Sequence, residues 1–299
     1  MTINASYFEQ VSQLLLPALK QRGSVLRSLV TEYPVVGDSE HIRAFDVGPA
    51  SFLDEAGGET KFTSVDYSRR LLKPRTIQNS ISISDEDMRK QYLQDPAYLA
   101  SEISASLGVL LDRDIIVPGL QGIAKVSTDK TYTDVALPAE NTIAYNVTNL
   151  DNSGNLAEGL TPSKVSLAVS MLQQRFNSPN IYCVASSYIL AQLRAHERSA
   201  SALFNSQQAM QSGIMGPYAG VLGFFPCEQL PKKVGDTTIE YAYVFCPEKI
   251  FLGIGADISM KAGEASTRNF NTIIQVKGSF DCVRMDEKSV IRIECKNTK

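Results

Sequence analysis

The chain has few of the residues from which metal centres are built. It contains only two histidines, His41 and His196, and they stand in unrelated sequence contexts. A site with several histidine ligands is therefore excluded, as is a two-histidine H-E-x-x-H helix. The sequence also lacks a G-x-S-x-G nucleophile turn and a G-x-x-x-x-G-K-S/T phosphate loop. A G-x-G at 253–255 and an S-x-x-K at 127–130 are interpreted as turns of the chain, without catalytic meaning.

Paired cysteines, long apolar runs and excess positive charge are missing as well. The five cysteines are odd in number and form no C-x-x-C, which favours reduced, mostly buried thiols over a disulfide framework. No apolar run approaches the roughly 18 residues that span a bilayer, and the first twenty residues lack the basic start of a signal peptide. The net charge of −3 gives no overall attraction to nucleic acid or to an anionic membrane. We therefore expect no membrane partner.

One long helix is predicted over residues 96–117. Asp95 and Pro96 form a helix start, with an N-cap followed by proline at the first helical position, and Pro118-Gly119 predicts the end. The helix would be about 32 Å long at about 1.5 Å per residue. Its apolar side chains recur every four residues and form one stripe, which we expect to be the core of the helix: Leu99, Ile103, Leu107, Leu111 and Ile115.

The same helix contains a D-x-D pattern, Asp112 and Asp114, which at other sites can hold a metal ion. Residues two apart on a helix point about 200° apart, so these two carboxylates cannot share one ion. We therefore interpret the pattern as part of a structural helix. Arg113 between them is available to pair with neighbouring groups.

Residues 34–84 have few apolar anchors and do not predict a globular lobe. The segment 76–84 alternates isoleucine with polar residues, as a half-exposed strand does. A long two-stranded projection fits this composition, and such a projection is marginal in isolation, so it needs a partner surface. Its basic cluster is expected to meet carboxylates of a neighbouring subunit: Arg69, Arg70, Lys73 and Arg75.

The remaining elements are predicted coarsely. Residues 4–21 favour an amphipathic helix, and residues 160–260 alternate helical and strand patterns, which predicts an α/β lobe. The segments YTDVALP and NTIAYNV read as a short strand pair. Residues 271–295 read as a hairpin with a polar turn at 285–288.

This order of parts resembles the major capsid protein of tailed bacteriophages, the Hong Kong 97-type fold. The resemblance runs along nearly the whole chain, and the order and spacing of several stretches carry it. They are QRGSVLRSLV, LQDPAYLASEISASLGVLLDRDII, VALPAENTIA, FLGIGADIS and VKGSFDCVRMDEKSVIRIEC.

The resemblance implies an α+β fold with named parts. These are an N-terminal arm (1–33), an extended E-loop hairpin that lies over a neighbouring subunit (34–84), a P-domain with a long spine helix (85–155), an α/β A-domain (156–262) and a returning P-domain hairpin (263–299). The spine helix would be the helix 96–117. The A-domain would meet its copies around the hexamer and pentamer axes.

The implied function is that of a major capsid protein and not of an enzyme, with no catalytic residue, metal or cofactor. Copies would assemble into hexamers and pentamers of an icosahedral shell that encloses double-stranded DNA without sequence-specific binding. The location would be the virion, after assembly in the cytoplasm of the host bacterium. Some family members carry a scaffold-like extension ahead of the arm, for which this chain has no room. This implies a separate scaffolding protein, or none. A separate scaffolding protein and a portal protein are the expected partners.

Two alternatives remain open from the sequence. An encapsulin-like compartment shell shares the fold, and a soluble α/β hydrolase with a disordered insertion at 34–84 is a reading from another class. No nucleophile–base pair supports the hydrolase. Particle size separates the classes, since an enzyme elutes as a small oligomer whereas a shell protein forms megadalton particles or capsomers.

Overall fold

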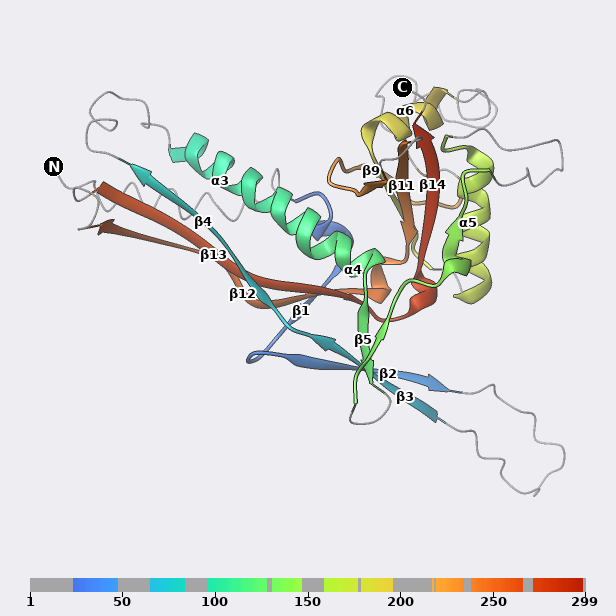
Figure 1. The fold of residues 1–299 in the computed structure, drawn as a ribbon, viewed down its shortest axis with the longest axis horizontal. Coiled ribbons are helices and arrows are strands. Elements are labelled where there is room, and N and C mark those ends of the chain that lie inside the picture. The colour runs from blue at the N-terminus through green and yellow to red at the C-terminus, as the bar shows by residue number, and fades with distance from the viewer. Residues whose placement is uncertain are drawn as a thin grey trace.

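The computed structural model combines a long curved sheet with a helix along it, a compact lobe at one end and a projecting hairpin (Figure 1). The amphipathic helix expected over 4–21 and the hairpin tip lie outside the described residues. Those residues are 24–47, 65–83, 96–127, 131–146, 159–176, 179–195, 217, 219–233, 238–265 and 271–297.

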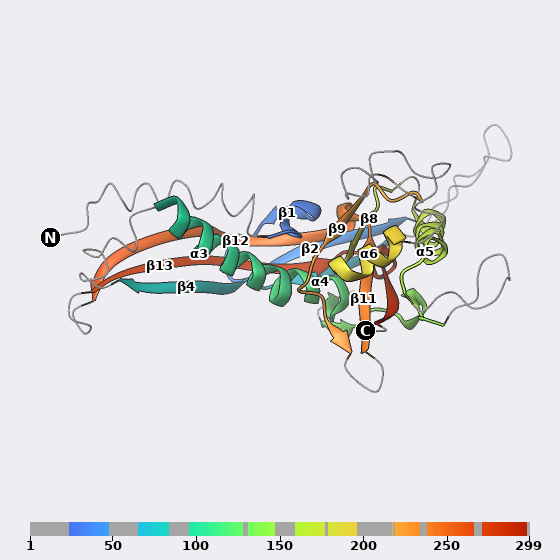
Figure 2. The ribbon, with the colours of Figure 1, turned by 90° about the horizontal axis from the view of Figure 1, so that it is seen from above.

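The long sheet has the strand order β1-β12-β13-β4. Its strands are β1 (Thr31–Pro34), β4 (Arg75–Ile83), β12 (Ile250–Ala265) and β13 (Asn271–Arg284). Figure 2 shows β12, β13 and β4 running side by side along the length of the molecule. The β12 strand is interrupted by register shifts between Ile254 and Ser259, so the G-x-G at 253–255 lies at a bulge within a strand and not at a strand-end turn.

The spine helix packs on this sheet through its apolar stripe. It begins with α3 (Pro96–Leu111), continues through a π-helical segment (Asp112–Ile116) and ends with α4 (Val117–Gln121). The five expected stripe residues, Leu99, Ile103, Leu107, Leu111 and Ile115, are each at most 5% exposed. They share one apolar cluster with strand residues such as Ile77, Ile274 and Phe280. Burial of a helix stripe against strands is the main source of stability for such a layer.

The predicted helix end at Pro118-Gly119 is wrong, because the helix continues to Gln121. Proline has no N–H, so in a regular helix Pro118 would leave the carbonyl of Asp114 without a donor. Here the Arg75 guanidinium donates to that carbonyl at 2.8 Å. Gly119 serves close packing: a Cβ at this position would lie 2.5 Å from the Cys282 sulfur and 2.8 Å from the Cys282 carbonyl oxygen. The two residues are thus accommodated by strand β13 and by Arg75.

The compact lobe is built on a second sheet in the order β7-β14-β11-β8-β9, with β10 (Lys232–Lys233) beside β11. The strands are β7 (Thr142–Ile143), β8 (Tyr182–Ala185), β9 (Gly223–Pro226), β11 (Thr238–Phe245) and β14 (Val290–Asn297). Helices α5 (Pro162–Arg175) and α6 (Ser187–Ala195) belong to the same lobe. Thr161 starts α5 as a side-chain cap that accepts from the Lys164 amide at 3.3 Å.

This second sheet is buried on both faces. Strand alternation sends Cys183 and Val244 into the cluster with α5 and α6, and sends Val184 and Tyr243 into the cluster with the spine helix. Four buried residues of the two helices, Val165, Val169, Leu172 and Leu190, pack on the α5 side. Val184 is buried too, but it packs on the spine side. This sheet therefore lies between the apolar cluster of α5 and α6 and the apolar cluster of the spine helix.

Two expected strand pairs are wrong. The strands of the supposed C-terminal hairpin, β13 and β14, do not pair with each other: β13 pairs with β12 and β4, and β14 pairs with β11 and β7. Likewise β6 (Thr133–Val135) pairs with β5 (Ala124–Ser127), while β7 pairs with β14. Alternation of apolar and polar residues along the sequence indicates a strand, but it does not indicate which strand it pairs with.

The sheets contain strands from more than one of the expected domain ranges. Strand β12 falls in the expected A-domain range 156–262 but belongs to the long sheet, and β14 falls in the expected P-domain range 263–299 but completes the lobe's sheet. Strand β4 falls in the expected E-loop range 34–84, yet it pairs with β13 along its whole length. The projecting part is therefore the shorter hairpin of β2 (Glu40–Val47) and β3 (Val65–Leu72).

Candidate functional site

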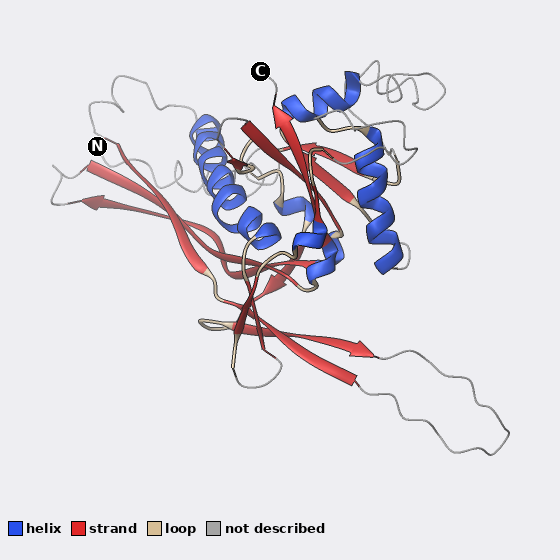
Figure 3. Ribbon diagram, turned by 45° about the vertical axis from the view of Figure 1, so that its right-hand side comes forward, coloured by secondary structure: helices blue, strands red, loops and turns tan. Residues whose placement is uncertain are grey.

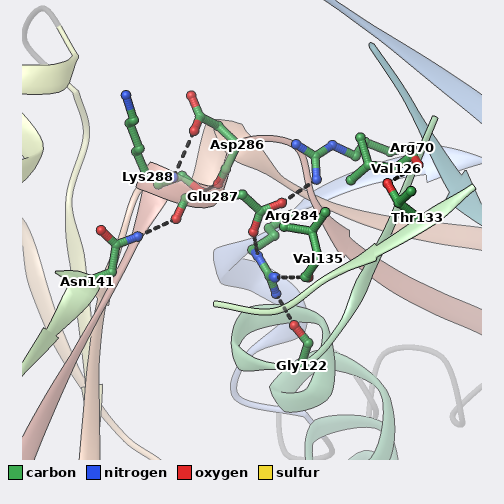
Figure 4. A network of polar contacts seen from close by, with 11 residues as sticks. Arg70, Gly122, Val126, Thr133, Val135, Asn141, Arg284, Asp286, Glu287 and Lys288 are labelled. Atoms are coloured by element: carbon green, nitrogen blue, oxygen red, sulfur yellow. Dashed lines mark hydrogen bonds and ion pairs between the residues drawn. The ribbon is translucent and has the colours of Figure 1, made fainter. Parts of the chain in front are cut away.

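The point where the sheets, the spine helix and the hairpin meet is held by one buried arginine. Arg284 is the last residue of β13 and is fully buried. Its guanidinium donates to the carbonyls of Gly122, just after α4, and of Val135 on β6, the latter at 2.7 Å (Figure 4). Its Nε forms a short ion pair with Glu287. A buried arginine with this many acceptors fixes the relative positions of the elements that carry them.

Glu287 connects this arginine to the hairpin and to the lobe. Its carboxylate also pairs with Arg70 of β3, and its carbonyl accepts from the Asn141 side chain at 2.5 Å. The Asn141 oxygen in turn accepts from Arg175, at the end of α5, at 2.7 Å. The contacts from Arg175 to Arg70 therefore link α5, the β13–β14 connection and the base of the hairpin. Figure 4 shows the part of this network from Asn141 to Arg70.

The basic cluster predicted from the sequence is divided by the fold. Arg70 is only 7% exposed, and its guanidinium contacts Glu287 of its own chain. Arg75 supports the spine helix through the Asp114 carbonyl. The Lys73 amide donates to Asp281 at 2.7 Å, while its side chain is exposed, as is that of Arg69. Arg69, Lys73 and Arg75 are the members of the cluster whose residues are classed as exposed.

The fold also separates the two carboxylates of the D-x-D pattern, since one is buried and the other is on the surface. Asp112 is 3% exposed, and its carboxylate accepts from the Ser24 hydroxyl and from the amides of Val25 at 2.9 Å and Leu26 at 3.3 Å. Asp114 lies on the surface and pairs with Arg113 at 2.8 Å. Asp112 thus caps the turn at 24–26, within the range expected for the N-terminal arm, and the sequence did not indicate this contact.

Burial dominates the titration of Asp112. It raises the pKa of this carboxyl above its ordinary value, although the hydrogen bonds from residues 24–26 act in the opposite direction. At Asp114 the hydrogen bond from Arg113 lowers the pKa. The two carboxylates therefore differ in position, partner and proton affinity.

A groove of about 890 Å³ lies between the hairpin base, the end of α5 and the connections that flank β12 and β14. Apolar side chains such as Ile42, Phe251 and Met285 line part of it. Its charged lining is mostly basic, with Arg43, Arg70, Arg175, Lys249 and Lys288 against Glu248 and Asp286. The groove is therefore positive in a chain whose net charge is −3.

The titratable residues of the described ranges do not assemble a reactive centre. All five cysteines are buried free thiols. Burial raises the pKa of Cys246 and Cys295 to about 12 and that of Cys227 to about 11, so these sulfurs stay protonated and unreactive. No group of three His, Cys, Asp or Glu among the described residues could hold a metal ion. No helix within them is long and apolar enough to cross a membrane.

Sequence reasoning missed Arg284, Glu287 and the role of Asp112. The i, i+3 spacing of Arg284 and Glu287 was a weak signal, since opposite charges at that spacing often pair within one turn. Nothing local indicated that Arg284 would be buried, because its acceptors Gly122 and Val135 are far away in the sequence.

Solved structures that share this fold include phage capsids and a virus-like particle. The capsid of the cyanophage P-SCSP1u matches with a TM-score of 0.67 at 13% identity, over 93% of this chain and 90% of that one. The capsid of Ralstonia phage GP4 matches with a TM-score of 0.65 at 13% identity, over 91% and 88%. A virus-like particle from Pyrococcus furiosus matches with a TM-score of 0.56 at 10% identity, over 97% and 100%.

Sequence comparison gives the family. No curated protein matches this chain. The family model for phage capsid proteins matches residues 3–297, which is nearly the whole chain. The long sheet with its spine helix, the lobe and the projecting hairpin are the parts expected for the Hong Kong 97-type fold, and the chain belongs to the phage capsid protein family.

Proposed function

We propose that copies of this chain assemble through their projecting hairpins into the hexamers and pentamers of an icosahedral shell around double-stranded phage DNA. The observation that carries this is the hairpin itself. Strand β3 has a second neighbour, β5, only at Arg69 and Arg70. From Ser68 outward to Val65, β2 and β3 pair with nothing but each other within the described residues (Figure 3).

An isolated two-stranded ribbon is marginal in water, so a partner surface is needed to keep it ordered. Tyr67 lies on this ribbon with 61% of its surface exposed. Identical copies supply such a surface when they form a closed ring, because each copy then presents its hairpin to the next. The exposed Arg69 and Lys73 at the hairpin base are proposed to face carboxylates of that neighbour.

The wider partners follow from the same proposal. The proposed partners are a separate scaffolding protein during assembly and a portal protein through which DNA enters. With a net charge of −3, the subunit would enclose DNA without holding it strongly, since tight DNA binding depends on positive charge. Assembly would take place in the host bacterial cytoplasm, and the protein would then reside in the virion.

A compartment shell is the second candidate, favoured by the fold match to the Pyrococcus furiosus particle. The phage capsid family model, which covers nearly the whole chain, supports the phage shell instead. The hydrolase alternative has no supporting observation.

The test is sedimentation and electron microscopy of the purified protein. We expect capsomers or closed shells, and nuclease-protected DNA in particles taken from infected cells. A protein that stays monomeric in all conditions and copurifies with no particle would contradict the proposal. Closed particles filled with a protein cargo would favour the compartment shell.

A further inference from the structure

We propose that the basic groove beside the hairpin base receives the acidic segment Asp54–Glu59 of the hairpin tip of a second copy. This inference rests on the proposed self-assembly and names the surfaces through which two copies meet.

The groove carries positive charge that its own chain does not fully neutralise. Five cationic side chains line it against two acidic ones. Three of the five have partners: Arg70 contacts Glu287, Arg175 contacts Asn141, and Lys249 lies 5.8 Å from the Phe176 ring centroid. Within the described chain, the exposed side chains of Arg43 and Lys288 form no ion pair. Arg43 lies on β2, and Lys288 lies just before β14.

A second observation points to a missing acceptor at this groove. The Nε atom of Arg70 is buried and has no hydrogen-bond partner among the described residues. An unsatisfied buried donor on a charged group is unfavourable, and an arriving acceptor would relieve it. A carboxylate is the acceptor that arginine binds best, because two N–H groups can face two oxygens.

The sequence between β2 and β3 has the complementary chemistry. Residues 48–64 contain Asp54, Glu55 and Glu59 and a single basic residue, Lys61. The other dense acidic stretch, Asp85 to Asp87, is followed at once by Arg89 and Lys90, which neutralise most of it. Charge alone therefore favours the hairpin segment, and the second stretch serves as a matched control.

The direction in which the hairpin projects favours binding of its acidic segment to the groove of a second copy over binding to the groove of its own subunit. Ile42, Ala44, Ser68 and Arg70 of the hairpin line the groove. The two strands stay paired beyond these residues, as far as Val47 opposite Val65, and so carry the chain about 10 Å further from the groove at about 3.4 Å per residue. A projection on one side and a complementary groove on another are the two halves of a head-to-tail contact between copies.

The experiment uses charge reversal at both halves. The groove variant is Arg43→Glu/Lys288→Glu, the tip variant is Asp54→Lys/Glu55→Lys/Glu59→Lys, and a third chain combines both. The matched controls are Lys261→Glu/Lys277→Glu, two exposed lysines on β12 and β13, and Asp85→Lys/Glu86→Lys/Asp87→Lys. Circular dichroism checks folding, and sedimentation with electron microscopy measures assembly.

We expect the groove and tip variants to fold and to fail to assemble, the combined chain to recover assembly, and both controls to behave as the wild type. Either single-half variant assembling normally would overturn the inference, as would a combined chain that stays unassembled. Wild-type assembly is the separate test of the proposed function.

A binding assay keeps the inference testable if the purified wild type does not assemble. A fluorescent peptide of residues 48–64 is titrated against the tip variant, whose groove is intact and whose own tip cannot compete. We expect saturable, salt-sensitive binding that weakens about tenfold with Arg43→Glu/Lys288→Glu in the same background. Unchanged binding in that background would refute the groove. Binding by the tip variant but not by an unassembled wild type would mean that the chain's own tip occupies the groove, and would refute the second copy as its occupant.

Discussion

Replacement of Arg284 by methionine tests whether the junction holds the subunit together. Methionine keeps most of the apolar stem, so the change removes the guanidinium and little packing. The carbonyls of Gly122 and Val135 lose their donor, and Glu287 keeps only Arg70 as an ion-pair partner. Breaking a buried ion pair from one side costs about 3–5 kcal/mol. Because Glu287 is 16% exposed and keeps one partner, we expect the lower part of that range, about 3 kcal/mol.

The assay is the free energy of unfolding in urea, measured on unassembled subunits. Arg113→Met is the matched control, because Arg113 is exposed and pairs only with its neighbour Asp114; its unfolding curve should not move. A double-mutant cycle with Glu287→Gln should give a coupling energy of about 1 kcal/mol or more between the two positions. A loss below about 1 kcal/mol for Arg284→Met, with no coupling to Glu287, would refute the view that this arginine holds the junction.

Other changes probe the spine helix, its cap and the lobe. Leu107→Asp buries an unpaired charge on the apolar stripe, and we expect no soluble folded protein, as checked by expression and solubility. Asp112→Ala leaves the donors of residues 24–26 unsatisfied and should cost about 1–3 kcal/mol in urea unfolding, whereas Asp114→Ala should change little. The pKa of Asp112 is raised in the folded state, so its stabilising contribution is greatest below the unfolded pKa and is lost as pH rises through the folded value. Wild type should therefore gain stability relative to Asp112→Asn as pH falls from 7 towards about 4; a constant difference would contradict this. Cys183 is fully buried and should resist thiol reagents until the protein unfolds, so rapid labelling of the native protein would count against the lobe's core.

The apolar stripe of the spine helix was predictable because its period is local to the sequence. The end of that helix was not, since Pro118 is tolerated only because Arg75 reaches the Asp114 carbonyl. Glycine is a residue type that often ends helices, yet Gly119 lies inside this one, where it allows close packing against Cys282. Arg75 and Cys282 lie on β4 and β13, far from residue 118 in the sequence. The sequence around residue 118 therefore could not indicate either contact.

The partners of the strands and of the junction residues were also unpredictable, because they lie far away in the sequence. Alternation correctly indicated β4, β13 and β14, because side chains on a strand alternate between two faces. It could not indicate that β13 and β14 enter different sheets, since the pairing partner of a strand is set by the rest of the fold. Arg70 looked like its basic neighbours until burial and Glu287 separated it from them.

The position of β14 in its sheet has a consequence for synthesis of the protein. This strand lies between β7 and β11, yet it follows both of them in the chain. Translation proceeds from the N-terminus, so a ribosome releases β7, β8 and β11 while the place beside β11 is still empty. The lobe can close only after residues 290–297 have left the exit tunnel. A nascent chain therefore carries an open sheet edge until β14 has been synthesised, and a chain truncated before β14 keeps that edge permanently. Completion of the lobe thus depends on synthesis of residues 290–297.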